Sequence, residues 1–323
     1  MVYINGGCFA LMTMKTNNKE YNKKIAVNTL LQFLDKSVIN VEGPTEDVFV
    51  DNIADVEHTN EYTLDWINPN KQNKQTIAEN SKAKVIIADE NVQYTDSMKG
   101  KTLIYVKNPK LALIHVGNEF FVAKQQEGIH PTAVIDPEAS IGKGVYIGAY
   151  CIIGKAIIGS NTVILSNVRI YDNVTIGNNC YIKEGVIIGG TGFGYVIDEE
   201  GNRVRFPHIG GVLIGSNVDI GSNSCIDRGA LSNTIIEDYV KIANLCQIAH
   251  NVKIGNNSMI VACSQISGSC QIGKDVWIGP NVTVRDWRKI DDNALVGIGA
   301  TVVCDIPDNE VWAGNPAKYF RNK

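Results

Sequence analysis

The chain has 323 residues and a mass of 35.3 kDa, a length that fits about two domains of about 100–200 residues each. Hydrophobic residues make up 44% and charged residues 20%, which excludes a wholly disordered chain. The net charge of −4 disfavours binding to nucleic acid, and no apolar run approaches the roughly 18 residues of a membrane span, so neither kind of contact is expected.

The opening residues give no sign of a secretory signal. The apolar run at residues 8–12 is short and has neither a basic leader nor a cleavage site. Eight cysteines are scattered without CxxC spacing, which is typical of reduced thiols and not of a disulfide framework or a zinc site. We therefore expect a cytoplasmic protein without a bound metal.

Residues 1–128 predict a small α/β domain. An amphipathic pattern over 17–37 predicts a helix, and apolar runs within 82–90 and 101–109 predict short buried strands. A second helix is expected over 108–121. Residues 128–131, Gly-Ile-His-Pro, are typical of a linker into the next domain.

A period of six residues governs the chain from residue 129 to 305. Ile or Val occupies every sixth position from Ile236 to Val302, twelve times without a slip, and earlier blocks repeat the pattern. A helix would scatter these residues around its axis, whereas a solenoid of short strands points one aliphatic side chain inward per strand. Three hexads per coil predict a triangular prism of about eight coils, followed by a tail over 306–323. A β-sandwich with fortuitous spacing is the alternative, which the unbroken series disfavours.

Two interruptions of the repeat are candidate sites, because loops that project from rigid scaffolds tend to carry function. One is the glycine-rich stretch between Ile188 and Ile209, and the other is the ten-residue unit that begins at Ile226. His250 is third in its hexad, which places it near a corner, either as a catalytic group or as an ordinary surface histidine. His208 ends the long loop, where it either serves the site or bonds the backbone. Motifs for phosphoryl transfer and zinc hydrolysis are absent.

Three stretches carry a resemblance to a known family: IGGTGFGY (188–195), PHIGGVLIGSNVDIGSNSCIDRGAL (207–231) and NLCQIAHNVKIG (244–255). They resemble the UDP-3-O-acylglucosamine N-acyltransferases of lipid A biosynthesis. WINPNK (66–71) and LIYVKNPKLAL (103–113) are similar to that family's uridine-binding domain. The resemblance implies a nucleotide-binding role for residues 1–128, a left-handed parallel β-helix, and a homotrimer with active sites between neighbouring subunits.

The resemblance also implies roles for individual residues. His250 matches the catalytic base, Gly268 the residue whose amide faces the thioester oxyanion, and Asn68 the asparagine of the nucleotide-binding motif. Imidazole can take a proton from an attacking amine near neutral pH, and a fixed N–H stabilises an oxyanion, so no metal is needed. The residues expected to bind substrate are Trp66, Asn68, Phe193, Tyr195, His208, Asn244 and Gln247. The alternative for Trp66 is that its side chain packs in the domain core and does not contact substrate.

Several positions depart from the family pattern. Ala243, followed by Asn244, stands where the family has an aspartate, and Trp287 stands where it has a second histidine. Asp65 replaces the aromatic residue that stacks on uracil, and Thr191 replaces an acidic residue of the loop.

The C-terminal residues VWAGNPAKYFRNK (311–323) resemble the ends of coenzyme A-dependent sugar acetyltransferases. We therefore expect an N-acyltransferase that uses a short acyl-CoA on a nucleotide-linked amino sugar, for surface polysaccharide such as O-antigen or capsule. Its donor contacts would be Trp287, Pro316, Lys318 and Arg321. The alternative is the lipid A enzyme, with the phosphopantetheine of acyl carrier protein as donor. A scaffold or carbonic-anhydrase-like protein is disfavoured, because His208 and His250 are too few to hold zinc.

Overall fold

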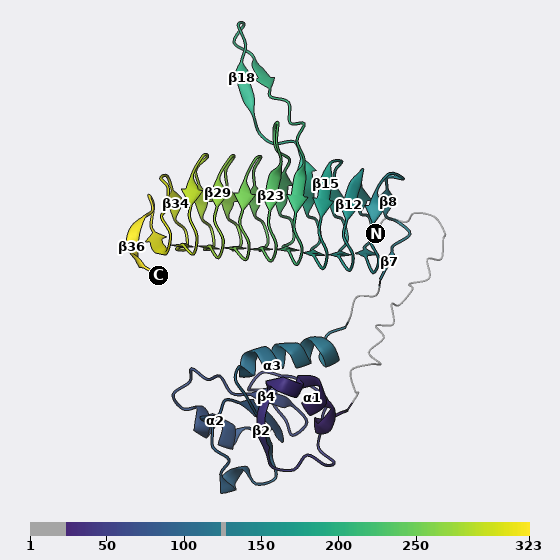
Figure 1. Ribbon diagram of the computed structural model, residues 1–323, viewed down its shortest axis with the longest axis vertical. Coiled ribbons are helices and arrows are strands. Elements are labelled where there is room, and N and C mark those ends of the chain that lie inside the picture. The colour runs from purple at the N-terminus through teal and green to yellow at the C-terminus, as the bar shows by residue number, and fades with distance from the viewer. Residues whose placement is uncertain (1–23, 124–126) are drawn as a thin grey trace, which may run out of the picture. The chain divides into compact units, whose positions relative to one another are not determined.

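The computed structural model describes residues 24–123 and 127–323 and divides into two compact units between residues 124 and 125 (Figure 1). The first unit is the small α/β region and the second is the solenoid. Among the described residues, no helix combines the length and the apolar character that a membrane crossing requires.

The N-terminal unit is built on a four-stranded sheet in the order β2-β6-β5-β4. Strands β4, β5 and β6 are parallel and β2 is antiparallel to β6. The sheet strands are β2 (Val38–Glu42), β4 (Leu64–Trp66), β5 (Val85–Ala88) and β6 (Thr102–Val106). A separate antiparallel pair consists of β1 (Ile25–Ala26) and β3 (Phe49–Val50). The helical elements are α1 (Val27–Leu34), η1 (Asp35–Ser37), α2 (Lys74–Asn80), η2 (Asp96–Met98), α3 (Pro109–Val116) and the π-turn η3 (Gly117–Phe121).

Both faces of this sheet are buried. Along β5, Val85 and Ile87 join one apolar cluster, while Ile86 and Ala88 join another. Alternate residues of a strand point to opposite faces, so helices cover both sides. The helix expected over 17–37 is shorter, because Ile25 and Ala26 pair as a strand instead; residues 17–23 lie outside the described residues.

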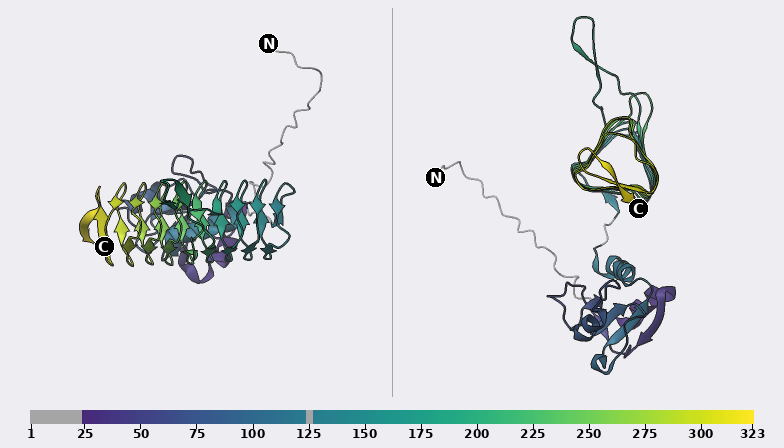
Figure 2. Two further views of the ribbon diagram at one scale, coloured as in Figure 1. Left: turned by 90° about the horizontal axis from the view of Figure 1, so that it is seen from above. Right: turned by 90° about the vertical axis from the view of Figure 1, so that its left-hand side faces the viewer.

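The second unit confirms the parallel β-helix predicted from the hexads. Three sheets of 11, 9 and 8 strands form the faces of a triangular prism, whose cross-section is visible in Figure 2. The repeated aliphatic residues point inward; Ile248 and Ile266, for example, have no exposed surface. Each such burial contributes about 1.5–3 kcal/mol, so the stacked coils support one another.

The three faces are defined by their strands. The first face holds β7 (Gly128–Ile129), β10 (Tyr146–Ile147), β13 (Val163–Ile164), β16 (Tyr181–Ile182), β21 (Asp219–Ile220), β24 (Lys241–Ile242), β27 (Met259–Ile260), β30 (Trp277–Ile278), β33 (Leu295–Val296), β35 (Glu310–Ala313) and β36 (Lys318–Asn322). The second holds β8 (Val134–Ile135), β11 (Ile152–Ile153), β14 (Arg169–Ile170), β17 (Ile187–Gly190), β22 (Cys225–Asp227), β25 (Gln247–Ile248), β28 (Gln265–Ile266), β31 (Thr283–Val284) and β34 (Thr301–Val302). The third holds β9 (Ser140–Ile141), β12 (Ala156–Ile158), β15 (Val174–Ile176), β20 (Val212–Ile214), β23 (Thr234–Ile236), β26 (Lys253–Ile254), β29 (Gln271–Ile272) and β32 (Lys289–Ile290).

The residues after 305 correct the expectation that the tail leaves the repeat. Ile306 is buried and bridges Ile290, and β35 extends the first face in parallel register with β33. Strand β36 then folds back antiparallel on β35. We call residues 306–323 the C-terminal cap, because they cover the last coil, whose aliphatic side chains would otherwise meet water.

One long loop projects from the prism as a hairpin (Figures 1 and 2). Its strands are β18 (Tyr195–Ile197) and β19 (Arg203–Arg205), which pair antiparallel. The hairpin leaves the second face after β17 and rejoins the third face at β20, so it interrupts the edge between those two faces.

Candidate active site

The edge between the second and third faces carries both interruptions of the repeat, and we call it the loop-bearing edge. His250 lies on it, between β25 on the second face and β26 on the third. The corner position that the hexad predicted for His250 is therefore confirmed. From the first interruption onward, the loop-bearing edge comprises residues 191–211, 228–233, 249–252, 267–270 and 285–288.

Gly268, one coil beyond His250, lies directly beneath its imidazole. A Cβ added at Gly268 would stand 2.7 Å from His250 Nε2, closer than carbon atoms are observed. Glycine is therefore the residue that lets the imidazole approach the backbone of the next coil. The N–H of Gly268 donates no hydrogen bond within the described part of the chain, which leaves it available to a ligand.

The glycine-rich loop brings His208 against His250. Their ring centroids are 5.1 Å apart in a T-shaped arrangement, and a Cβ at Gly192 would meet both histidines within 3.0 Å. His208 is only 9% exposed, and its Nδ1 lies 3.0 Å from the carbonyl oxygen of Phe206. A carbonyl only accepts, so Nδ1 carries the proton, while Nε2 is buried without a partner among the described residues.

Asp227 introduces a half-buried carboxyl group close enough to His250 to interact with it electrostatically. It ends β22, and Gln247 Nε2 donates to its Oδ2 over 2.8 Å. Burial raises the pKa of Asp227 to about 6, against the lowering effects of His250 and of the Gln247 hydrogen bond. A carboxyl group with a raised pKa beside a candidate base is a common mark of a functional centre.

Two hollows flank His250, and both are lined by His250 and Trp287. The first hollow has a volume of about 440 Å³, and its lining consists of Phe193, Gln247, Ala249, His250, Gln265, Ile266, Ser267, Gly268, Asp286 and Trp287. The second hollow, of about 500 Å³, is more apolar; its lining consists of Gly194, Tyr195, Val196, Phe206, His208, Ala230, Leu231, Ser232, His250, Asn251, Lys253, Ser269, Gln271 and Trp287. Each is large enough for part of a substrate, and they meet at the imidazole.

The structure thus brings together most of the site residues predicted in the solenoid. Phe193 and Gln247 line the first hollow, Tyr195 and His208 line the second, and Trp287 lines both.

Asn244 lies on the edge between the first and second faces and not on the edge that carries His250, and its predicted role in substrate binding stays a prediction. It precedes β25, whereas His250 follows that strand, and its Oδ1 accepts a hydrogen bond from Ser222 N. The two residues are one hexad apart, and an offset of six residues moves a side chain to the next edge of the prism.

Three predicted donor contacts belong to the C-terminal cap. Pro316, Lys318 and Arg321 line neither hollow. Lys318 and Arg321 lie on the exposed strand β36, and the Arg321 guanidinium donates to the carbonyl oxygen of Asn322. The cap places these residues at the end of the solenoid, so of the predicted donor contacts only Trp287 borders His250.

The N-terminal unit holds the remaining predicted residues. Trp66 is half-buried and packs against the apolar cluster beneath β5, which is the alternative reading of this side chain. Asn68 follows β4, and its Oδ1 accepts from Asn70 N.

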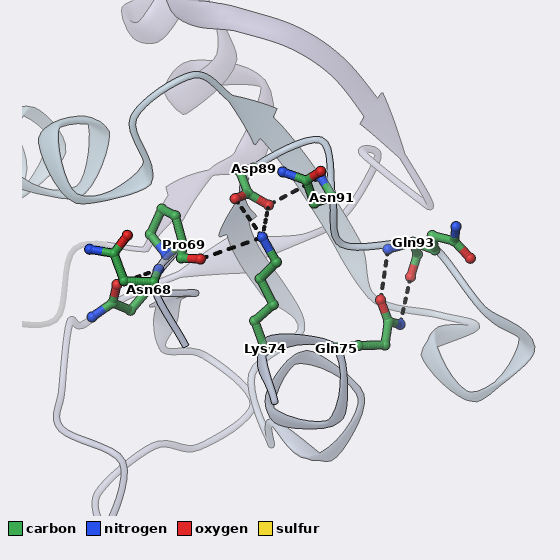
Figure 3. A network of polar contacts seen from close by, with 8 residues as sticks. Asn68, Pro69, Lys74, Gln75, Asp89, Asn91 and Gln93 are labelled. Carbon is green, nitrogen blue, oxygen red and sulfur yellow. Dashed lines mark hydrogen bonds and ion pairs between the residues drawn. The ribbon is translucent and has the colours of Figure 1, made fainter. Parts of the chain in front are cut away.

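A polar network centred on Lys74 and Asp89 lies beside Asn68 at the carboxyl ends of the parallel strands (Figure 3). Lys74 Nζ donates to Asp89 Oδ2 over 2.9 Å and reaches toward the carbonyl oxygen of Pro69. Burial would raise the pKa of Asp89, but hydrogen bonds from Lys74 and Asn91 outweigh it, and the pKa is lowered. In open parallel sheets this edge is where ligands usually bind.

Asp227 and Asn251 are among the residues near His250 that were missed in the sequence. Asp227 lies in the ten-residue unit, where the hexad gives no register. Asn251 was not singled out, yet its Oδ1 lies 3.0 Å from His250 Nδ1. The available signal was adjacency to the candidate base and to the irregular unit.

Comparison with known proteins adds relatives to this geometry. A family model described as bacterial transferase hexapeptide (six repeats) matches residues 155–190 and 233–268. UDP-3-O-acylglucosamine N-acyltransferase 1 of Francisella tularensis subsp. holarctica (strain OSU18) is 42% identical over 258 residues, 73% of this chain and 73% of that protein. The UDP-3-O-acylglucosamine N-acyltransferase of Saccharophagus degradans is 40% identical over 262 residues, 75% and 74% of the two chains. The solved structure of LpxA from Acinetobacter baumannii is similar with a TM-score of 0.54 at 29% identity, covering 59% of this chain and 73% of that one.

Proposed function

The chain belongs to the family of UDP-3-O-acylglucosamine N-acyltransferases, which are acyltransferases of nucleotide sugars, and from that premise we propose its specific reaction. The proposed reaction moves an acyl group from the thioester of an acyl carrier protein to the amine of UDP-linked 3-O-acylglucosamine. One observation carries this proposal: the imidazole of His250 lies at the meeting point of two hollows, against Gly268, whose N–H has no partner among residues 24–123 and 127–323.

Each of these groups has a task in acyl transfer. The amine nitrogen attacks the thioester carbonyl carbon while His250 Nε2 takes a proton from that nitrogen. The Gly268 N–H would stabilise the resulting oxyanion. As the carbon–sulfur bond breaks, the imidazolium returns its proton to the leaving thiolate, so that His250 ends the cycle neutral.

The donor is where the proposal departs from the main reading of the sequence. A short acyl-CoA and a role in O-antigen or capsule were preferred there, but the relatives carry the name of the alternative, the lipid A enzyme. The residues chosen to meet the coenzyme A nucleotide, Lys318 and Arg321, sit in the C-terminal cap. The phosphopantetheine arm of a carrier protein needs no such contacts.

The remaining elements complete the proposal. The N-terminal unit binds the nucleotide through Asn68, with Trp66 supporting the base or the core. The protein acts as a homotrimer, because both hollows are open grooves on a single prism and a second prism would enclose the substrates.

The experiment is a donor competition followed by mass spectrometry. Purified protein receives UDP-3-O-acylglucosamine with either 3-hydroxyacyl carrier protein or acyl-CoAs of matched chain lengths. We expect N-acylated product with the carrier protein, and a loss of kcat of about 10²–10⁴-fold in His250→Ala. Turnover with acyl-CoA alone would refute the donor, and full activity of His250→Ala would refute the base.

A further inference from the structure

The ten-residue unit of the solenoid forms hydrogen bonds to the side chain of Asn251, which lies beside His250. Asn251 Oδ1 accepts from the backbone N–H of Ala230 over 3.0 Å, and a backbone N–H can only donate. Asn251 Nδ2 donates to Ser232 Oγ over 2.9 Å, which fixes the amide in the same orientation. Ala230 and Ser232 both belong to the ten-residue unit. A regular hexad in place of that unit would lack these two hydrogen-bond partners, and the Asn251 amide would not be fixed.

The orientation of the amide decides the tautomer of His250. His250 Nδ1 lies 3.0 Å from Asn251 Oδ1, and that oxygen can only accept, so Nδ1 carries the proton. In the neutral imidazole the lone pair is then on Nε2, the atom that lies over Gly268. We propose that Asn251 is a positioning residue that holds His250 as the Nδ1–H tautomer and aims its basic nitrogen at the first hollow.

The Asn251 amide is neutral. A carboxylate at this position would orient the ring in the same way, but its negative charge would in addition favour the imidazolium form of His250. The other titratable groups around His250 are His208 from the glycine-rich loop, Asp227 from the preceding coil, and Lys253 and Asp286 from the walls of the hollows. A neutral orienting group fixes the ring without adding a negative charge to theirs. The consequence for catalysis rests on the proposed function, whereas the tautomer itself does not.

The variants follow from the backbone. Asn251 has φ of 63°, a left-handed conformation that glycine adopts freely and aspartate tolerates. Asn251→Gly therefore deletes the amide without straining the corner, and Asn251→Asp keeps an acceptor. Asn257→Gly is a matched control, since Asn257 has φ of 60° at a corner outside the site.

The first measurement is nitrogen NMR of the full chain with 15N-labelled histidine, at a pH where the imidazoles are neutral. The chain has five histidines, and the His250→Ala spectrum identifies the signal. We expect His250 to be protonated on Nδ1 in the wild type, in Asn251→Asp and in Asn257→Gly, and to lose that preference in Asn251→Gly. A wild-type His250 protonated on Nε2, or an unchanged tautomer in Asn251→Gly, would overturn the proposal.

The second measurement is the pH dependence of turnover. Asn251→Gly should lower kcat about 10–100-fold with little change in KM, and Asn251→Asp should restore most of it. The carboxylate of Asn251→Asp should move the acid limb of kcat/KM up by about one to two pH units. An acid limb that does not shift in an active Asn251→Asp variant contradicts the proposal. This result still tests the proposal if Asn251→Gly does not fold. Absence of turnover with every donor would refute the proposed function and leave the NMR result standing.

Discussion

The imidazole of His250 and the backbone of Gly268 are in such close contact that the next coil has no room for a side chain, with 2.7 Å between Nε2 and a would-be Cβ. The relationship joins a base and an amide donor from two successive coils. Neither residue moves independently, because the strands before them, β25 and β28, are paired in register.

Gly268→Ala should damage catalysis while leaving the fold intact. The new methyl group displaces the imidazole, so we expect kcat to fall about 10²-fold, the scale of a misplaced catalytic group. Gly268 does not have a left-handed backbone, and the melting temperature should therefore stay close to that of the wild type.

Gly190→Ala is the control for this substitution. A Cβ at Gly190 would meet only Ile187 Cγ2, at an ordinary 3.8 Å. Equal losses in both variants, measured by steady-state kinetics, would mean that the His250–Gly268 contact is not what matters.

Asp227→Asn should stabilise the solenoid in a pH-dependent way. Burial raises the pKa of Asp227 from 3.8 to about 6, so the folded state holds the proton more tightly than the unfolded state. The free energy of unfolding therefore falls as the pH rises from about 4 to about 6. Above that window the folded state carries the full cost of an ionised, half-buried Asp227. We expect Asp227→Asn to gain about 1–3 kcal/mol over the wild type at pH 7.5 and little at pH 4.

Urea unfolding at the two pH values measures this difference. Asp219→Asn, on the exposed first face, controls for the loss of one negative charge. A gain for Asp227→Asn that is the same at both pH values would show that the carboxyl group does not titrate in the folded protein as the structure indicates.

Asn68→Ala should weaken binding of the sugar nucleotide. Asn68 lies where β4 ends, beside the network of Lys74 and Asp89, so its loss should raise KM for the nucleotide sugar about tenfold and change kcat less. Asn70→Ala, two residues away and exposed, is the matched control. An unchanged KM in folded Asn68→Ala moves the nucleotide site away from this edge.

Removal of residues 306–323 should destabilise the solenoid instead of weakening donor binding alone. The truncation uncovers the end of the last coil and loses the buried Ile306 and Val311, each contributing about 1.5–3 kcal/mol. We expect a clear drop in melting temperature. Lys318→Glu with Arg321→Glu reverses two exposed charges and should leave melting and donor KM unchanged. A raised KM for acyl-CoA in that double variant would restore the coenzyme A reading of the cap.

The hexads predicted the solenoid well because each inward position depends only on its own strand. Ile248 and Ile266 are completely buried, and the corner position of His250 follows from counting. The side chains around His250 were harder to predict, because the irregular units contribute some of them, such as His208 and Asp227, and orient another, Asn251. Asp227 bonds to Gln247, and Asn251 bonds to Ala230 and Ser232 of the ten-residue unit; no period encodes either arrangement.

The C-terminal cap was misjudged for a related reason. The hexad ends near residue 305, and the sequence then suggested a separate tail, yet β35 pairs in register with β33. Strand pairing can continue after the side-chain period is lost, since backbone hydrogen bonds do not require a particular residue type. The first helix was also overestimated, because tertiary pairing of Ile25 with Val50 overrides the local pattern.

Because the coils are stacked, the geometry of the active site does not depend on how many coils the solenoid has. His250 and Gly268 are eighteen residues apart and belong to adjacent coils, and each coil bonds only to the one before and the one after. Duplication of a whole coil between Trp287 and the C-terminal cap would therefore lengthen the prism and leave the base, the amide and the ten-residue unit in place. The number of coils can therefore change without disturbing the site, and loops inserted at one edge can change substrate specificity independently of that number.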